Sequence, residues 1–149
     1  MLDEKTTRAL AAAIVDRPRA TLQELAQAAG ISKATLYRCS RTREQLIDDL
    51  RKYCADVMMQ QLQRHQIETA EPLQALKCII QFHLEHVEFS SFIFYHWQQD
   101  TPAGETPVEL WSEHTRILDQ VFLRGQQQGV FRVDVSAQTL SDACGFLIC

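Results

Sequence analysis

The sequence contains no asparagine and little glycine or proline, with five and four of these residues in 149. So few turn-forming residues in an otherwise ordinary globular composition favour a helical chain. No run of 18 uncharged apolar residues occurs, and the first residues, MLDEKTTRAL, lack the apolar core of a signal peptide. We therefore expect a soluble, cytoplasmic, all-α protein that does not interact with membranes.

Signatures of cofactor, metal and redox chemistry are also scarce. The five cysteines are odd in number and form no Cys-x-x-Cys, which favours reduced thiols. His83 and His86 lie three residues apart with Cys78 nearby, yet no matched pair supplies the remaining ligands of a metal site. A Cys–His enzyme would need an orienting residue and an oxyanion element, which we do not find. The sequence predicts no metal, no cofactor and no enzymatic activity.

Charge divides the chain into two regions. Residues 1–64 carry 11 Lys and Arg against 8 Asp and Glu, whereas residues 65–149 carry 4 against 11. Between Arg17 and Arg43 six basic residues stand against one acid, Glu24. A polyanion is the natural partner of such a segment, although charge alone also fits a solvated surface without function.

The pattern of helix-capping and turn residues between Thr21 and Cys39 favours nucleic-acid binding over a solvated surface without function. Thr21-Leu22-Gln23-Glu24 has the form of a capping box and predicts a helix over residues 22–29. Gly30 can end it, and Ser32 can cap a third helix over residues 33–39, with Leu36 facing inward. With a first helix over residues 3–15, this predicts a homeodomain-like three-helix unit containing a helix-turn-helix, whose second helix enters the major groove of DNA. The same pattern also occurs in helical proteins that do not bind DNA.

The exposed side of this motif carries donors suited to DNA. Lys33 and Arg38 offer charged donors, small Ala34 allows close approach to a base, and the hydroxyls of Thr21 and Ser32 lie near helix starts. A fourth helix begins at Thr42 and Arg43, beside the same face. The predicted DNA-binding residues are Thr21, Ser32, Lys33, Ala34, Thr35, Tyr37, Arg38, Arg41, Thr42 and Arg43.

These residues resemble the DNA-binding domain of the TetR family of bacterial transcriptional repressors. The resemblance lies in Gly30-Ile31-Ser32-Lys33-Ala34-Thr35-Leu36-Tyr37 and in Thr42-Arg43-Glu44-Gln45-Leu46. It implies that the residues from Lys33 to Tyr37 lie on the recognition helix and that Tyr37 and Arg43 hold phosphates. It also implies a homodimer, a double-stranded operator and an effector site in the second half. Where many members have His-Phe, this chain has Cys39-Ser40.

The second half predicts a helical bundle, to which the family resemblance assigns effector binding and dimerisation. Apolar residues recur at threes and fours from Arg43 to about His65, which predicts one long amphipathic helix. Pro72 opens a fifth helix with an inward face formed by Leu73, Leu76, Ile79, Ile80, His83, Leu84 and Val87. A loop at residues 101–104, a helix closing near residues 125–129, and a last helix capped by Ser136 follow. We expect domains at 1–45 and 46–149, with the last helix interrupted at the chain end.

Aromatic residues gather between positions 82 and 97. They predict a pocket for a small hydrophobic or cationic aromatic effector, with Glu85 and Glu88 nearby. Most of these side chains would serve equally well as core. The candidate ligand-binding residues are Phe82, His86, Phe89, Phe94, Trp97 and Trp111.

The resemblance therefore implies a repressor of a multidrug efflux or similar operon that a small hydrophobic effector releases from DNA. Two other classes stay open. One is a DNA-binding module without sensing, or a truncated form acting through a full-length partner. The other is a helical enzyme using the histidines and cysteines.

Overall fold

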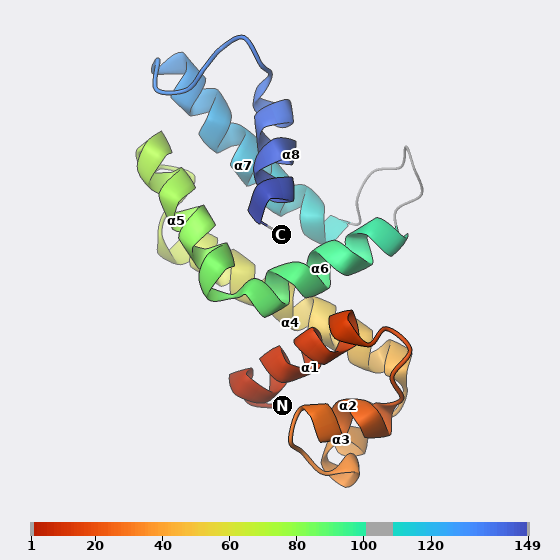
Figure 1. Cartoon of the computed structure of the whole chain (residues 1–149). Helices are drawn as coiled ribbons and strands as arrows, with labels where there is room; N and C mark the ends of the chain where they lie inside the picture. Colours follow the sequence, from red (N-terminus) through yellow and green to blue (C-terminus); the bar gives the residue numbers. More distant parts are fainter. Residues whose placement is uncertain (1, 101–108, 149) are drawn as a thin grey trace. The chain divides into compact units, whose positions relative to one another are not determined.

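The computed structural model describes residues 2–100 and 109–148, with side chains described from Leu2 to His96 and from Glu113 to Leu147. Every regular element in these residues is an α-helix, which confirms the predicted class (Figure 1). None of the described helices is long and apolar enough to cross a bilayer. The helices are α1 (Glu4–Asp16), α2 (Leu22–Ala28), α3 (Lys33–Cys39), α4 (Arg43–Arg64), α5 (Pro72–Glu85), α6 (Val87–Asp100), α7 (Glu109–Gln127) and α8 (Ala137–Ile148).

The chain forms two compact units. Unit 1 comprises Met1–Cys54 with Glu88–Asp100, and unit 2 comprises Ala55–Val87 with Thr101–Cys149. One boundary falls inside α4, so this helix contributes residues to both units.

The N-terminal helices of unit 1 enclose a small aliphatic core. Asp3 caps α1 by accepting a hydrogen bond from the Thr6 backbone N–H at 2.7 Å. The core side chains, each at most 2% exposed, are Leu10, Ile14, Leu25, Leu36 and Leu46. These residues come from α1, α2, α3 and α4, so the core fixes the three short helices on the start of α4 (Figure 1).

The helix α6 also belongs largely to unit 1, which the sequence pattern did not predict. Phe89 is 3% exposed and meets the Tyr53 ring edge-on, with 5.7 Å between centroids. The Arg8 guanidinium lies 5.4 Å from the centre of the Phe89 ring and 3.4 Å from a Glu88 carboxylate oxygen. The pair Arg8–Glu88 and the ring of Phe89 therefore join α1 to α6 within this unit.

Unit 2 contains α5, α7 and α8, with α7 packed against both of the others. Its core includes Ile79, Val121 and Phe122. A side chain at Gly125 would collide with the Phe131 ring, because this ring lies directly against the α7 backbone and closes the turn that follows. Ser136 caps α8 as predicted, by accepting a hydrogen bond from the Thr139 backbone N–H at 3.1 Å. The predicted loop at 101–104 lies outside the described residues.

The predicted inward face of the fifth helix is partly wrong. Leu73, Leu84 and Val87 are 47%, 66% and 48% exposed, and the helix ends at Glu85, so Val87 begins α6. The buried line instead consists of Pro72, Ala75, Ile79 and His83. Apolar residues occur on more than one side of this segment, so their periodicity alone does not identify the side that becomes buried.

Three further findings bear on the sequence predictions. The four described cysteines, Cys39, Cys54, Cys78 and Cys144, are free thiols. Near the end of α8, Phe146 and Leu147 are 58% and 88% exposed. No group of metal-ligating side chains is assembled among the described residues.

Candidate nucleic-acid interface

The helix α2 begins and ends with the signals predicted from its sequence. The Thr21 hydroxyl accepts from the Glu24 backbone N–H at 3.3 Å, and the Glu24 carboxylate accepts from the Thr21 backbone N–H at 2.7 Å. The hydrogen bond from the Thr21 backbone lowers the pKa of Glu24. At the other end Gly30 has φ +68°, which lets Gly30 and Ile31 donate to the carbonyls of Gln27 and Ala26. The turn is therefore closed on both sides by local bonds.

The helix α3 follows directly and has the bounds that the sequence predicts. Ser32 caps it by accepting from the Thr35 backbone N–H at 3.0 Å. Leu36 is completely buried and holds the inner side. The opposite side is open to solvent: the side chains of Lys33, Ala34, Tyr37 and Arg38 are exposed, and Thr35 is half-buried.

Lys33 is held in place before any ligand arrives. Its ammonium donates to the Gln23 amide oxygen at 3.3 Å and lies 5.4 Å from the centre of the Tyr37 ring. Gln23 belongs to α2, so this contact joins the two helices of the motif on their exposed side. Sequence reasoning missed Gln23, because a lone glutamine ten residues from Lys33 carries no recognisable signal.

The remaining predicted contacts lie just before and at the start of α4. Arg41 and Thr42 are exposed, and the Thr42 hydroxyl accepts from the Gln45 backbone N–H at 3.1 Å. The Gln45 side chain in turn accepts from the Arg41 backbone N–H at 2.9 Å. Arg43 differs from its neighbours: it is half-buried, and its Nη2 donates to the Pro18 carbonyl at 2.6 Å.

Ser40 lies at the end of α3, where many members of the resembled family have Phe. It is 2% exposed, and its hydroxyl donates to an Asp49 carboxylate oxygen at 2.8 Å. The end of α3 is therefore tied to α4 by a polar contact instead of an aromatic ring.

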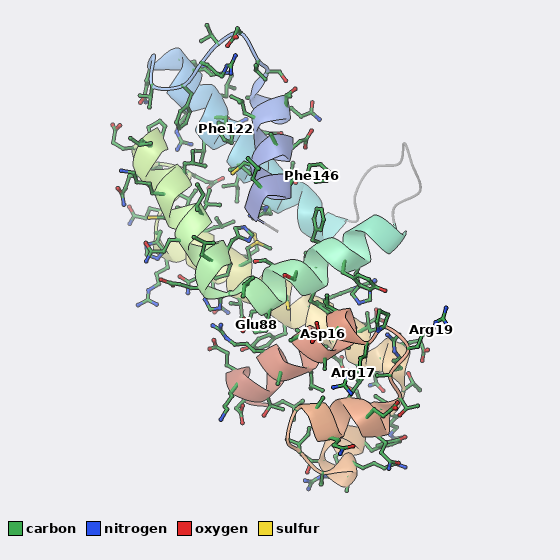
Figure 2. The ribbon with its side chains drawn as sticks, in the orientation of Figure 1. Asp16, Arg17, Arg19, Glu88, Phe122 and Phe146 are labelled. Atoms are coloured by element: carbon green, nitrogen blue, oxygen red, sulfur yellow. The ribbon has the colours of Figure 1, made fainter. Side chains whose placement is uncertain are left out.

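Two more cations lie in unit 1 at the turn between α1 and α2. Arg17 and Arg19 are exposed, and Figure 2 labels both at this turn. Together with Lys33, Arg38 and Arg41 they give unit 1 a set of solvent-accessible positive charges within and beside the helix-turn-helix segment. Such a surface suits the phosphates of a nucleic acid.

Unit 2 contains a small pocket. It holds about 250 Å³ of empty space, part of it open to solvent. Its walls are mainly apolar, and its polar side chains are glutamine, cysteine and histidine. The lining residues are Met58, Gln61, Leu62, His65, Ile67, Cys78, Ile79, Phe82, His83 and His114.

Two of the lining histidines are uncharged at neutral pH. Burial lowers the pKa of His83 to about 4, with a smaller contribution from His86. Burial likewise lowers the pKa of His114 to about 3, with a smaller contribution from His83. Their rings meet edge-on, 5.5 Å apart between centroids. The pocket thus offers neutral imidazoles in an apolar wall.

The predicted ligand-binding residues are distributed over both units. Phe82 lines the pocket of unit 2, and its ring lies 4.5 Å from that of His86. Phe89 and Phe94 belong to unit 1, where Phe89 packs on Arg8 and Tyr53. The side chains of Trp97 and Trp111 lie outside the described residues.

The capped helices, the glycine turn and the exposed cations define a helix-turn-helix protein of the DNA-binding kind. No protein-family model matches the chain. Over 142 residues it is 46% identical to the HTH-type transcriptional regulator NfxB of Pseudomonas aeruginosa, covering 94% of this chain and 75% of NfxB.

Solved structures agree on the fold. The TetR-family regulator PfmR of Thermus thermophilus matches with a TM-score of 0.67 at 22% identity, covering 99% of this chain and 83% of PfmR. AibR, in complex with isovaleryl coenzyme A and operator DNA, matches with a TM-score of 0.69 at 22% identity, covering 96% and 81%. The chain belongs to the family of helix-turn-helix transcriptional regulators that includes NfxB, and it has the fold of the TetR-family regulators.

Proposed function

We propose that the chain is a repressor whose α3 reads an operator in double-stranded DNA. The main observation that supports this proposal is that α3 buries Leu36 on one side and exposes its other side to solvent. Unlike a plain solvated helix, this open side presents a charged donor, a small residue and an aromatic hydroxyl at helical spacing. The proposed contacts are Thr21, Ser32, Lys33, Ala34, Thr35, Tyr37, Arg38, Arg41 and Thr42.

The same proposal includes an effector that binds in unit 2 and weakens DNA binding. The pocket at His83 and His114 supports an uncharged hydrophobic molecule with a hydrogen-bonding group, because among the described residues its lining includes no carboxylate. This composition gives less support to a cationic effector. An efflux operon is the proposed target, on the basis of the relationship to NfxB.

Three further properties belong to this proposal. A homodimer would place two copies of α3 on half-sites about one helical turn apart, or a multiple of that distance. A regulator of this kind acts on chromosomal DNA, so we place it in the cytoplasm. The histidines and cysteines have no catalytic role in this account.

One observation favours a second candidate, a DNA-binding module without sensing. The pocket encloses room for only about one water molecule, whereas sites for drug-sized ligands measure roughly 300–1,000 Å³. A thermal-shift screen of dyes, biocides and quinolone-like compounds separates the candidates. Saturable stabilisation by one class supports sensing, provided that the same class weakens DNA binding, and its absence across the panel favours the module.

The DNA-binding proposal is tested by selection from a random duplex pool, followed by variants on the enriched duplex. Lys33→Ala and Tyr37→Ala should each weaken binding by about 1–3 kcal/mol without changing the thermal unfolding midpoint. Lys77→Ala, an exposed lysine of unit 2, is the matched control and should bind as the wild type does. Unchanged affinity in both α3 variants would falsify the proposed recognition helix.

A further inference from the structure

Arg43 stands at a position where a cation is locally unfavourable. It is the first residue of α4, next to the positive end of the helix dipole, where acidic residues are preferred. A contact beyond its own helix can offset this cost. Two contacts could do so, a DNA phosphate or an acceptor inside the protein, and they predict different positions for the guanidinium.

The guanidinium is turned towards the protein. Nη2 donates to the Pro18 carbonyl at 2.6 Å, across 25 residues of sequence. Nε is buried and has no hydrogen-bond partner among the described residues. A phosphate could not reach this Nε–H unless the side chain left its place and gave up the bond to Pro18.

The acceptor belongs to the turn that follows α1. Its carbonyl lies just beyond the negative end of that helix, which favours a cation there. The turn leads directly into the Thr21 cap of α2, whereas Arg43 follows directly after α3 and the Ser40–Thr42 segment. One hydrogen bond therefore joins the residues before the helix-turn-helix to the residues after it.

We propose that Arg43 is a positioning residue that sets the orientation of α2 and α3, and that it does not contact phosphate. By closing the segment between Pro18 and α4, it limits how far the recognition helix can tilt relative to the rest of unit 1. The effect on DNA is exerted through Lys33 and its neighbours on α3. This inference rests on the proposed function, since it concerns how the same DNA surface is held.

The test compares Arg43→Met with Arg41→Met, an exposed arginine two residues away. Affinity is measured on the duplex enriched by the wild type and on a random-sequence duplex of equal length, over a range of salt and well below the melting temperature. The affinity of Arg43→Met for the enriched duplex should fall about tenfold, and its affinity for the random duplex should change little, because misplaced base contacts reduce specificity. Its salt slope should stay at the wild-type value.

Arg41→Met should instead weaken binding to both duplexes equally. It should also reduce the steepness with which log affinity falls with log salt by about 0.9, as loss of one phosphate contact does. Arg43→Lys, which keeps the charge, should lose specificity as Arg43→Met does. The proposal is overturned if Arg43→Met behaves like Arg41→Met and Arg43→Lys restores binding. It is also overturned if Arg43→Met melts earlier yet binds both duplexes as the wild type does. A wild-type chain that enriches no duplex removes the proposed function as well, and this appears before any variant is compared.

Discussion

The helix starts of unit 1 and the packing between segments of unit 2 illustrate two kinds of polar contact, local and long-range. In the first, caps join residues three apart, as in Asp3 with Thr6, Thr21 with Glu24 and Ser32 with Thr35. In unit 2, Arg124 donates to the carbonyls of Ile67 and Ala70, across 57 and 54 residues.

Arg116 of unit 2 likewise reaches Glu68 at 2.8 Å, 48 residues away. Local contacts specify a helix wherever their residues occur in the sequence, whereas distant contacts exist only once the bundle has formed. This difference explains why the structure of the DNA-binding segment can be predicted from the sequence, whereas the structure of the effector region is much harder to predict.

The largest effect is expected from a substitution in the core beneath the recognition helix. Leu36→Ala leaves a cavity at a fully buried site and should lower the free energy of unfolding by about 2–5 kcal/mol. Hydrogen exchange followed by mass spectrometry should show faster exchange in α3 and unchanged protection in α7. Equal loss of protection in both helices would mean that the two units unfold together, and the comparison would fail.

Acid should destabilise unit 2, because its buried histidines are uncharged in the folded chain. Because the pKa of His83 is lowered to about 4, the unfolded chain binds more protons than the folded chain between pH 6.5 and pH 4. The stability present above pH 6.5 is therefore lost as the pH falls, by an amount on the order of 3 kcal/mol for His83.

Urea unfolding at pH 7 and pH 4.5 measures this effect. His83→Gln should have a smaller pH dependence than the wild type, whereas a variant of exposed His65 serves as the control. If His83→Gln and the wild type lose equal stability over this range, His83 is not buried in its neutral form.

A smaller effect is expected at the cap of α2. Thr21→Ala removes the side-chain acceptor of the Glu24 N–H and should cost about 1 kcal/mol of stability. Gln27→Ala, on an exposed position of the same helix, should change stability by less than about 0.5 kcal/mol. Thermal unfolding of the two variants checks the difference, and equal midpoints would contradict the importance of the capping box.

The smallest effect concerns the turn after α4. Gln66 has φ +48°, a conformation that costs little only for glycine. Gln66→Gly should raise the free energy of unfolding by about 0.5 kcal/mol, the relief of strain exceeding the added freedom of the unfolded chain. A chemical-denaturation midpoint below that of the wild type would show that the Gln66 side chain makes a stabilising contact.

Much of unit 1 was predictable because its signals are short. The capping box at Thr21, the turn at Gly30 and the cap at Ser32 define α2 and α3, and the predicted bounds of α3 match the structure. The contacts of Gln23 and Arg43 were not predictable, since both have partners ten or more residues away.

The break between α5 and α6 could not be predicted from the sequence either. The helix stops at Glu85, although neither glycine nor proline occurs near His86. Phe89 then packs with Arg8 of α1, whereas aromatic clustering alone predicted a site shared with Phe82. Composition indicates that aromatic side chains gather, but only tertiary packing decides which partners they take.

The central claim is that the exposed cations of the helix-turn-helix bind the phosphates of duplex DNA. It is tested most directly by the affinity of the wild-type chain for its enriched duplex between about 50 and about 200 mM salt. We predict that the logarithm of the binding constant falls linearly with that of the salt concentration, with a slope of about −0.9 per phosphate contacted. A slope near zero would contradict the claim.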